Sequence, residues 1–330
     1  MERMLSGIKP TGKLTLGNYI GALKNFVKYQ ESYEMFIFIA NLHTLTCYQD
    51  PKELKKNLKD ALALYLACGL DEKKSLIFLQ SDVMAQAQLG YILSCNTYLG
   101  ELNRMTQYKD KIAKGENNLS AGFYTYPCLM AADILIYDPD YIPVGEDQKQ
   151  HVELTRDIAL RFNNRFGDCF KVPKPLIEKL GSRIMNLNNP LKKMSKSEND
   201  KGNIYLLDDL KTIEKKIMSA TTDSDNSIHY DKLNKPGISN LMTIKASLTD
   251  LSFSEIEAKY KGSGYGDFKK DVARVVCAEI ALIQNRYNEI INSNRIDSIL
   301  ENSSIIVNKL ANKKLNKVQR LLGIEIKKRK

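Results

Sequence analysis

Two lysines stand three positions apart in the segment Lys193-Met194-Ser195-Lys196-Ser197, inside a Ser/Lys/Asn-rich stretch from about residue 181 to 203 that is predicted to be a loop. Two ammonium groups at this spacing can hold one polyanion. When a nucleoside triphosphate loses pyrophosphate, charge accumulates on the leaving oxygens, and mobile lysines stabilise it as point charges. Judged on charge alone, a solvated lysine-rich loop is the simpler explanation, so the rest of the chain has to decide.

A second segment with possible chemistry is the turn at residues 7–18, punctuated by Gly7, Pro10, Gly12 and Gly17. It lies between a predicted strand (Arg3–Ile8) and a predicted helix (18–30). In a doubly wound sheet this connection opens at the carboxyl edge of the strands, where ligands bind, and the next helix presents its N–H groups to a phosphate. The turn matches neither G-x-x-x-x-G-K-[ST] nor G-x-G-x-x-G, which argues against the common NTPase and dehydrogenase sites.

The elements around these segments alternate between short apolar runs and longer helical patterns, as in an α/β domain with a parallel sheet. Strands are predicted at 3–8, 35–40, 76–80 and 141–144, and helices at 18–30, 51–68, 124–137 and 147–164, with a helical pattern from 85 to 113. Beyond residue 206 the strand-like runs fade, and amphipathic segments at 207–218, 268–291 and 305–322 predict a helical bundle.

Charge is concentrated at one end of the chain. The formal net charge is +10, and residues 309–330 hold nine lysines or arginines with Glu325 as the only acid. This imbalance fits a polyanionic partner such as nucleic acid, and it fits a solvated basic tail equally well.

The six cysteines are scattered, with no Cys-x-x-Cys pair and no neighbouring histidine that would complete a zinc site. They indicate buried thiols in a reducing compartment. No stretch approaches the ~20 apolar residues of a membrane span, and no signal peptide is evident, so a cytoplasmic location is expected.

Taken together, the segments resemble class I aminoacyl-tRNA synthetases, and in particular the bacterial tryptophanyl-tRNA synthetases. Residues 193–197 reproduce the KMSKS motif, and Thr15-Leu16-Gly17-Asn18 stands where the HIGH motif belongs, in the Thr-x-Gly-Asn form typical of the tryptophanyl enzymes. Residues 126–135, 144–159, 182–185 and 235–241 extend the resemblance over nearly the whole chain.

The resemblance implies a Rossmann-like catalytic domain at 1–205, with a helical insertion at about 101–140 and the KMSKS loop at 192–199. An all-helical domain with a basic C-terminus at 206–330 would bind the tRNA anticodon. The implied reaction activates L-tryptophan with ATP and Mg²⁺ and transfers it to tRNA(Trp), in a homodimer. Both attacking groups belong to substrates, so catalysis would rest on positioning and charge stabilisation, without a protein nucleophile or a protein-bound metal.

The resemblance also assigns residues to the ligands. Lys111, Lys193 and Lys196 are implied as the catalytic lysines around the phosphates. The residues implied for ATP are Lys9, Pro10, Thr11, Gly17, Asn18, Gly145, Glu146, Asp147, Ile184, Lys193, Met194, Ser195, Lys196 and Ser197. Lys9 stands where many relatives have Gln, and Leu5 where some have Phe at the mouth of the nucleotide pocket. Both differences concern the ATP contacts of the first loop.

For the amino acid, Asp133 is the main candidate, because an indole offers one N–H donor that a carboxylate accepts well. Its place in the apolar run 130–137 favours burial over a surface position. Met130 would line the ring pocket, and Tyr126 and Gln148 would hold the ammonium group. His43 follows the second strand and could touch substrate, although a structural role is the commoner one for such a histidine.

Three alternatives stay open on the sequence alone. A tyrosyl-tRNA synthetase would share the fold and the lysine loop, but Met130 stands where a polar partner for the phenol is expected. A small-molecule nucleotidyltransferase would leave the helical second half without a role. A basic RNA-binding protein that keeps an old synthetase fold would have no use for Lys193, Lys196 and Asp133.

Overall fold

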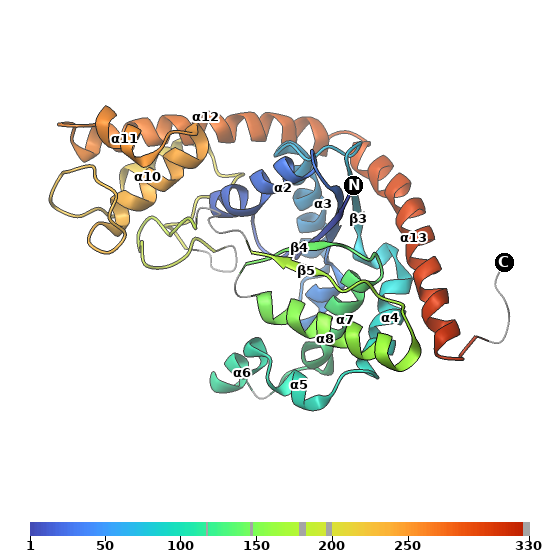
Figure 1. Cartoon of the computed structure of the whole chain (residues 1–330). Coiled ribbons are helices and arrows are strands. Elements are labelled where there is room, and N and C mark those ends of the chain that lie inside the picture. Colours follow the sequence, from blue (N-terminus) through green and yellow to red (C-terminus); the bar gives the residue numbers. More distant parts are fainter. Residues whose placement is uncertain (117, 146–147, 178–182, 196–199, 326–330) are drawn as a thin grey trace.

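Five parallel strands form one sheet in the order β3-β2-β1-β4-β5, which confirms the predicted doubly wound α/β fold (Figure 1). The computed structural model describes residues 1–330 except 117, 146–147, 178–182, 196–199 and 326–330. The strands are β1 (Arg3–Ile8), β2 (Glu34–Ile39), β3 (Ser75–Leu79), β4 (Tyr141–Pro143) and β5 (Lys174–Leu176). The short β5 was not predicted.

Side chains alternate between two buried faces of the sheet, as expected when helices cover a parallel sheet on both sides. Met4, Met35, Ile37 and Ile77 belong to one core cluster, while Leu5, Phe36, Phe38 and Phe78 belong to the other. β1 and β2 are paired in parallel from Arg3↔Glu34 to Ile8↔Ile39, which fixes this alternation.

The connections of the first half are mainly helical. One side of the sheet is covered by α1 (Leu16–Asn18), the π-helix η1 (Tyr19–Leu23), α2 (Lys24–Tyr29) and α3 (Pro51–Ala67). The chain also forms the 3-10 turns η2 (Leu42–Thr46) and η3 (Gln80–Asp82), and the helices α4 (Met84–Ser94), α5 (Leu99–Asn103), α6 (Thr106–Ala113), α7 (Ala121–Leu135) and α8 (Lys149–Phe166). The helix predicted at 18–30 is thus divided into three pieces.

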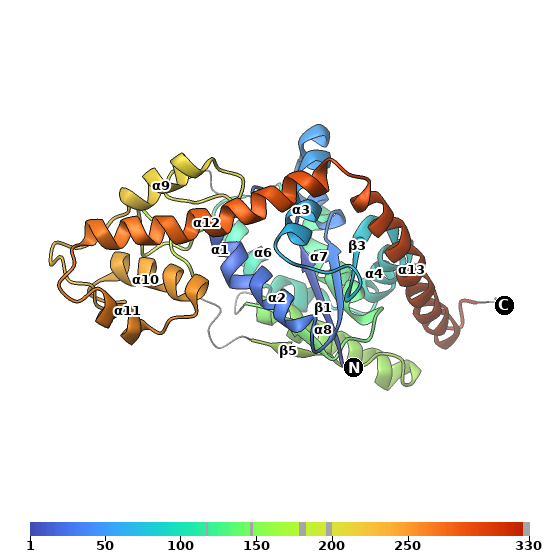
Figure 2. The ribbon, with the colours of Figure 1, turned by 90° about the horizontal axis from the view of Figure 1, so that it is seen from above.

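A helical lobe follows, made of α9 (Leu210–Met218), α10 (Pro236–Thr249), α11 (Phe253–Lys259) and the outer part of α12 (Tyr265–Ile291). Seen from above, α12 runs from this lobe across α3 (Figure 2). The Tyr287 hydroxyl of α12 donates to Asp60 of α3 at 2.7 Å, and Lys24 Nζ of α2 donates to the Ser247 carbonyl of α10 at 2.6 Å. These bonds join the lobe to two helices that cover the sheet.

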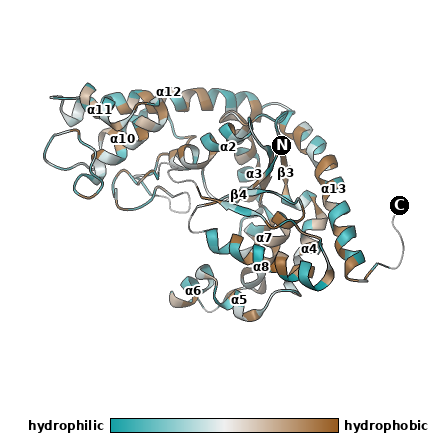
Figure 3. Ribbon diagram, in the orientation of Figure 1, coloured by the Kyte–Doolittle hydropathy of each residue, from teal (hydrophilic) through white to brown (hydrophobic). Residues whose placement is uncertain are grey.

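The last helix, α13 (Arg295–Leu321), does not belong to the lobe. Its residues Val307, Ala311, Leu315 and Val318 are buried in the same core cluster as Phe78 of β3. Figure 3 shows both hydrophilic and hydrophobic residues along α13, as expected of an amphipathic helix. The apolar stripe of α13 thus packs on the edge strand β3 and on α3 and α4, which belong to the first half of the chain.

In the part of the chain that the structure describes, no helix has both the length and the apolar character needed to cross a membrane.

Candidate active site

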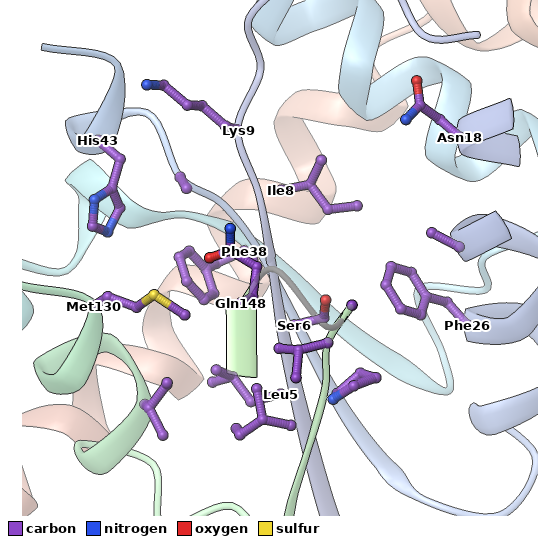
Figure 4. A pocket seen from close by; sticks show the side chains of 18 of the residues that line it. Leu5, Ser6, Ile8, Lys9, Asn18, Phe26, Phe38, His43, Met130 and Gln148 are labelled. Atoms are coloured by element: carbon purple, nitrogen blue, oxygen red, sulfur yellow. The ribbon is translucent and has the colours of Figure 1, made fainter. Parts of the chain in front are cut away.

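A cavity of about 450 Å³ opens at the carboxyl ends of the strands, where the strand order reverses at β1. β1 is paired with β2 along its whole length, but with β4 only at Met4↔Tyr141. The cavity lies beyond this pair, and residues of β1, β2, β4 and the following segments line it (Figure 4). Crevices at such switch points are the usual ligand sites of open α/β sheets.

Asn18 reaches this cavity from the first loop, and its orientation is fixed by a reciprocal cap. The Thr15 backbone N–H and hydroxyl both donate to Asn18 Oδ1 at 3.0 Å, and Thr15 Oγ accepts from the Asn18 N–H at 3.2 Å. With Oδ1 so engaged, the amide nitrogen is the group of Asn18 that can donate to a ligand.

The segment after the lysine loop packs back on the first loop. The Leu16 N–H donates to the Ile204 carbonyl, and the Leu206 N–H donates to the Leu14 carbonyl, each at 2.9 Å. Two segments about 190 positions apart in the chain are therefore fixed side by side, as the two motifs require if they serve one ligand.

The start of the lysine loop is held by a short antiparallel pairing. The Met194 N–H donates to the Ile184 carbonyl at 3.0 Å, and the Asn186 N–H donates to the Lys192 carbonyl at 2.8 Å. Met194 and Ile184 are both buried in the core, whereas Lys193 is exposed. Lys196 and Ser197 lie outside the described residues.

Aromatic and apolar side chains line the other end of the cavity. Phe38 and Met130 lie there together with Ile134, and Tyr126 and Gln148 add polar groups. The Tyr126 hydroxyl donates to Gln107 Oε1 at 2.9 Å and lies 2.5 Å from His151 Nε2. Burial raises the pKa of Tyr126, so the phenol stays protonated at neutral pH.

Asp133 lies fully buried on α7, behind the cavity wall that Met130 and His43 form. Gln80 Nε2 donates to both carboxylate oxygens, at 2.8 and 2.9 Å, and Gln86 Nε2 donates at 3.1 Å. His43 Nε2 lies 2.8 Å from Oδ2. Burial raises the pKa of Asp133, and the hydrogen bonds from His43 and Gln80 oppose this shift only in part.

Gln80 also fixes the turn that carries His43. Its Oε1 accepts from the Leu42 N–H at 3.0 Å, which leaves Nε2 directed at Asp133. The side chain thus connects the end of β3, the turn η2 and helix α7. Because an ionised carboxylate only accepts, the His43 Nε2 that faces it carries the proton.

Lys111 lies on α6, outside the lining of the cavity, and forms an ion pair with Glu116 at 2.6 Å. This carboxylate raises the pKa of Lys111. Both side chains are partly exposed, so the pair is weak enough to exchange for another anion.

Some of the site residues predicted from the sequence line the cavity, and others do not. Lining the cavity are Lys9, Asn18, Tyr126, Met130, Gly145 and Gln148. Described outside the lining are Pro10, Thr11, Gly17, Lys111, Asp133, Ile184, Lys193, Met194 and Ser195. Glu146, Asp147, Lys196 and Ser197 fall outside the described residues.

Sequence reasoning missed the glutamines Gln80, Gln86 and Gln107. Gln80 was assigned to the end of the third strand, and a polar residue at the carboxyl edge of a parallel sheet was the signal that could have identified it. Gln86 stands between two alanines and three positions from Val83 and Leu89, so a polar residue on an apolar helix face was its signal. Gln107 had no comparable signal, because it stands among polar residues.

Comparison with known proteins agrees with this geometry. Residues 1–279 match the family described as tRNA synthetases class I (W and Y). The chain is 52% identical over 330 residues to a tryptophan–tRNA ligase of Bacillus anthracis, covering 100% of both chains. It is 51% identical over 329 residues to that of Bacillus subtilis, covering 99% of both.

Solved structures agree as well. The tryptophanyl-tRNA synthetase of Mycoplasma pneumoniae superposes with a TM-score of 0.90 at 37% identity, covering 99% of this chain and 100% of that one. The Campylobacter jejuni enzyme, complexed with ADP and tryptophan, gives a TM-score of 0.84 at 38% identity, covering 97% and 99%.

Proposed function

The chain belongs to the class I tRNA synthetases for tryptophan and tyrosine and acts as a tryptophan–tRNA ligase, and we propose that ATP and tryptophan meet in the switch-point cavity. The observation that carries the substrate assignment is Asp133, a buried acceptor directly behind an apolar, aromatic-lined cavity. An indole presents the matching combination of one N–H donor and a large apolar surface.

The first step joins the tryptophan carboxylate to the α-phosphorus of ATP and releases pyrophosphate. The second transfers the aminoacyl group from the adenylate to the terminal ribose of tRNA(Trp). The protein supplies neither nucleophile, so its contribution is to align the reactants and to stabilise the charge on the leaving phosphates.

ATP would lie over the first loop. Asn18 and Lys9, which both line the cavity, would meet its phosphates, with Pro10, Thr11 and Gly17 forming the backbone beneath. Gly145, with Glu146 and Asp147, would approach the ribose. Since the side chains of Ile184 and Met194 are buried, the adenine would contact the backbone of this pair.

Lys193, Lys196 and Lys111 would neutralise the leaving pyrophosphate, with Ser195 and Ser197 allowing the loop to approach. For Lys111 this requires release from Glu116. No Asp or Glu is among the described residues that line the cavity. Mg²⁺ would therefore arrive bound to the ATP phosphates and be held mainly by them, supplying further charge neutralisation.

Tryptophan would lie between Phe38 and Met130, with its ammonium group near Tyr126 and Gln148. A carboxylate offers about four acceptor positions. Those of Asp133 are already occupied by two glutamines and His43. His43 also lines the cavity, so its bond is the one that an arriving indole N–H would replace.

Two surfaces of the protein would bind tRNA. The lobe of α9–α12 would bind the anticodon arm. α13 lies on the catalytic unit instead, with Lys309, Lys313, Lys317 and Arg320 exposed along it. This row would contact phosphates of the same tRNA.

A homodimer is supported by an exposed, largely apolar stripe on α4. Met84 is 84% exposed and Tyr91 73%, and Ala87 and Cys95 lie on the same helical face. Sedimentation velocity should show a dimer that Tyr91→Glu dissociates. The matched control is Leu233→Glu, at a 90% exposed leucine of the lobe. A monomeric parent protein would contradict the proposal.

Amino-acid-dependent ATP–pyrophosphate exchange tests the substrate assignment. Exchange should occur with tryptophan and be at least a hundredfold weaker with tyrosine, because the apolar Met130 lines the cavity where a polar partner for the phenol hydroxyl is expected. Exchange with tyrosine and none with tryptophan would overturn it.

A further inference from the structure

Helix α6 carries two side chains that concern the site, Gln107 and, one helical turn later, Lys111. Gln107 lines the cavity and accepts from Tyr126. Residues four apart lie on one side of a helix, so whatever orients α6 at Gln107 also orients Lys111.

α6 is weakly held by packing. None of its residues is buried, and its N-cap residue, Met105, provides no side-chain hydrogen bond. The contacts of α6 with other elements include the Gln107–Tyr126 bond and an edge-to-face contact of Tyr108 with Tyr124, with ring centroids 5.1 Å apart. An eight-residue helix of this kind depends on its end contacts.

The missing cap comes from another helix. Gln150 Oε1, in the first turn of α8, accepts from the Thr106 backbone N–H at 2.9 Å and from the Thr106 hydroxyl at 2.8 Å. Its Nε2 donates to the Arg104 carbonyl at 3.0 Å. One amide thus satisfies three groups at the junction of α5 and α6.

We infer that Gln150 is a positioning residue for Lys111: its amide caps α6 and sets the direction from which Lys111 reaches the phosphates of ATP. The inference rests on the role proposed above for Lys111. Gln150 stands two positions after Gln148, which lines the cavity, so the start of α8 is coupled both to the substrate site and to the helix that carries this lysine.

Steady-state ATP–pyrophosphate exchange tests this with Gln150→Ala and Gln150→Glu. The alanine variant should lower kcat about tenfold and change KM for tryptophan less than twofold, because only the leaving-group contact is misplaced. Glutamate still accepts from Thr106 and should restore kcat to within about threefold of the parent. Lys149→Ala, its exposed neighbour on α8, is the matched control and should leave kcat unchanged.

A double-mutant cycle with Lys111→Ala separates positioning from general damage. If Gln150 acts through Lys111, Gln150→Ala has no further effect on kcat in the Lys111→Ala background. A full tenfold loss in that background would overturn the inference, as would an unchanged kcat for Gln150→Ala alone.

Two further outcomes keep the test decisive. If Lys111→Ala alone leaves kcat unchanged, the role proposed for Lys111 is wrong and the inference falls with it. If Lys111→Ala slows exchange but Gln150→Ala does not, only the inference is wrong. Should Gln150→Ala not fold, as judged by circular dichroism, Thr106→Val replaces it in the cycle. It removes one of the two bonds to Oε1 and should lower kcat about threefold, with the same loss of effect beside Lys111→Ala.

Discussion

Gly17 of the first loop lies against Met194 of the lysine segment: a Cβ on Gly17 would be 3.3 Å from the Met194 carbonyl oxygen and 3.4 Å from its Cβ. These positions are separated by 177 residues in the chain. Their close approach leaves little room for a side chain at position 17, which favours glycine there.

Gly17→Ala should raise KM for ATP about three- to tenfold, since the methyl group forces Met194 away from the first loop by a few tenths of an ångström. KM for tryptophan should not change, because the amino acid is placed at the other end of the cavity. Exchange kinetics with each substrate varied in turn measure both values. Gly100→Ala is the control, because a Cβ there meets nothing within 4 Å. An unchanged KM for ATP would show that this contact does not shape the nucleotide site.

Asp133→Asn should raise KM for tryptophan by about 10- to 100-fold, as expected when a charged hydrogen-bond acceptor is removed. The new amide would also place a donor against the donors of Gln80 and Gln86. Glu153→Gln, an exposed carboxylate on α8, should leave KM unchanged. Exchange assays decide, and a KM for tryptophan within twofold of the parent would remove Asp133 from the indole site.

The pH dependence of the same KM follows from burial. Because the pKa of Asp133 is raised above 3.8, its carboxylate becomes protonated, and ceases to be a full acceptor, at a higher pH than an exposed aspartate does. KM for tryptophan should therefore rise as the pH falls through that raised pKa, and Asp133→Asn should flatten the rise. His43 faces the same carboxylate, so the profile is compared with that of His43→Asn. A profile that Asp133→Asn leaves unaltered would exclude this carboxylate as the titrating group.

The sequence was sufficient for the sheet and for part of the site. The strand at residues 3–8 was predicted at its observed ends because Pro10 and Gly12 of the following turn end its pattern directly after Ile8. By contrast, β5 has three residues, one of them Pro175, which is too short for a periodic pattern. The amphipathic pattern of α13 was visible, but a pattern cannot say which surface an apolar stripe covers.

The site shows the same division. Motifs identify residues that are close in the chain, such as Thr15 and Asn18, which the structure joins in a reciprocal cap. Gln80 and Asp133 are 53 positions apart, and only the fold brings them to 2.8 Å. The contacts of Gln80 and Gln86 with Asp133, and that of Gln150 with Thr106, therefore emerged from the structure alone.

Lys196→Ala should lower the rate of adenylate formation by about 10²–10³-fold and change tryptophan binding little, because the lysine meets charge that develops only in the transition state. Lys193→Ala should act in the same direction. Lys201→Ala, an exposed lysine just beyond this segment, is the control. Single-turnover adenylation and equilibrium tryptophan binding measure the two quantities. An equal loss of adenylation rate and of tryptophan affinity would mean that Lys196 contributes to substrate binding rather than to the transition state.

Asp271→Asn should destabilise the lobe at neutral pH by about 3–5 kcal/mol, because it leaves the buried ammonium group of Lys245 without its carboxylate. Burial would raise the pKa of Asp271, but hydrogen bonds from Lys245, Tyr260 and Arg274 outweigh it and hold this pKa well below 3.8. The stabilisation is therefore complete above about pH 4 and disappears as the pH falls toward the folded-state pKa.

Urea unfolding of the parent protein and the variant at pH 7 and near pH 3 measures this difference. The difference in the free energy of unfolding between the parent protein and the variant should be smaller at the lower pH. A gap that stays constant would mean that the carboxylate does not titrate differently in the folded and unfolded states.

Replacing Lys309, Lys313 and Lys317 of α13 with alanine should weaken tRNA binding and leave pyrophosphate exchange unchanged. The row is exposed and Leu315 and Val318, on the opposite face, are buried, so substitution removes charge without opening the core. Shortening the chain before Lys313 would also remove the buried Leu315 and Val318, so the loss of charge could not be separated from damage to the core. For every lysine that pairs with a phosphate, its removal should reduce the slope of log K against log [salt] by about 0.7–0.9, so the triple variant should lose roughly two to three units of slope if all three lysines touch the RNA.

The matched control removes Lys52, Lys55 and Lys59 from the exposed side of α3, which changes the net charge by the same amount. If α13 is a binding surface, the α3 variant keeps nearly the full slope, because long-range attraction between charges is screened beyond about 8–10 Å at physiological salt. Equal reductions of slope in both variants would indicate that the protein attracts tRNA through its total charge. The basic row on α13 would then be a solvated helix face.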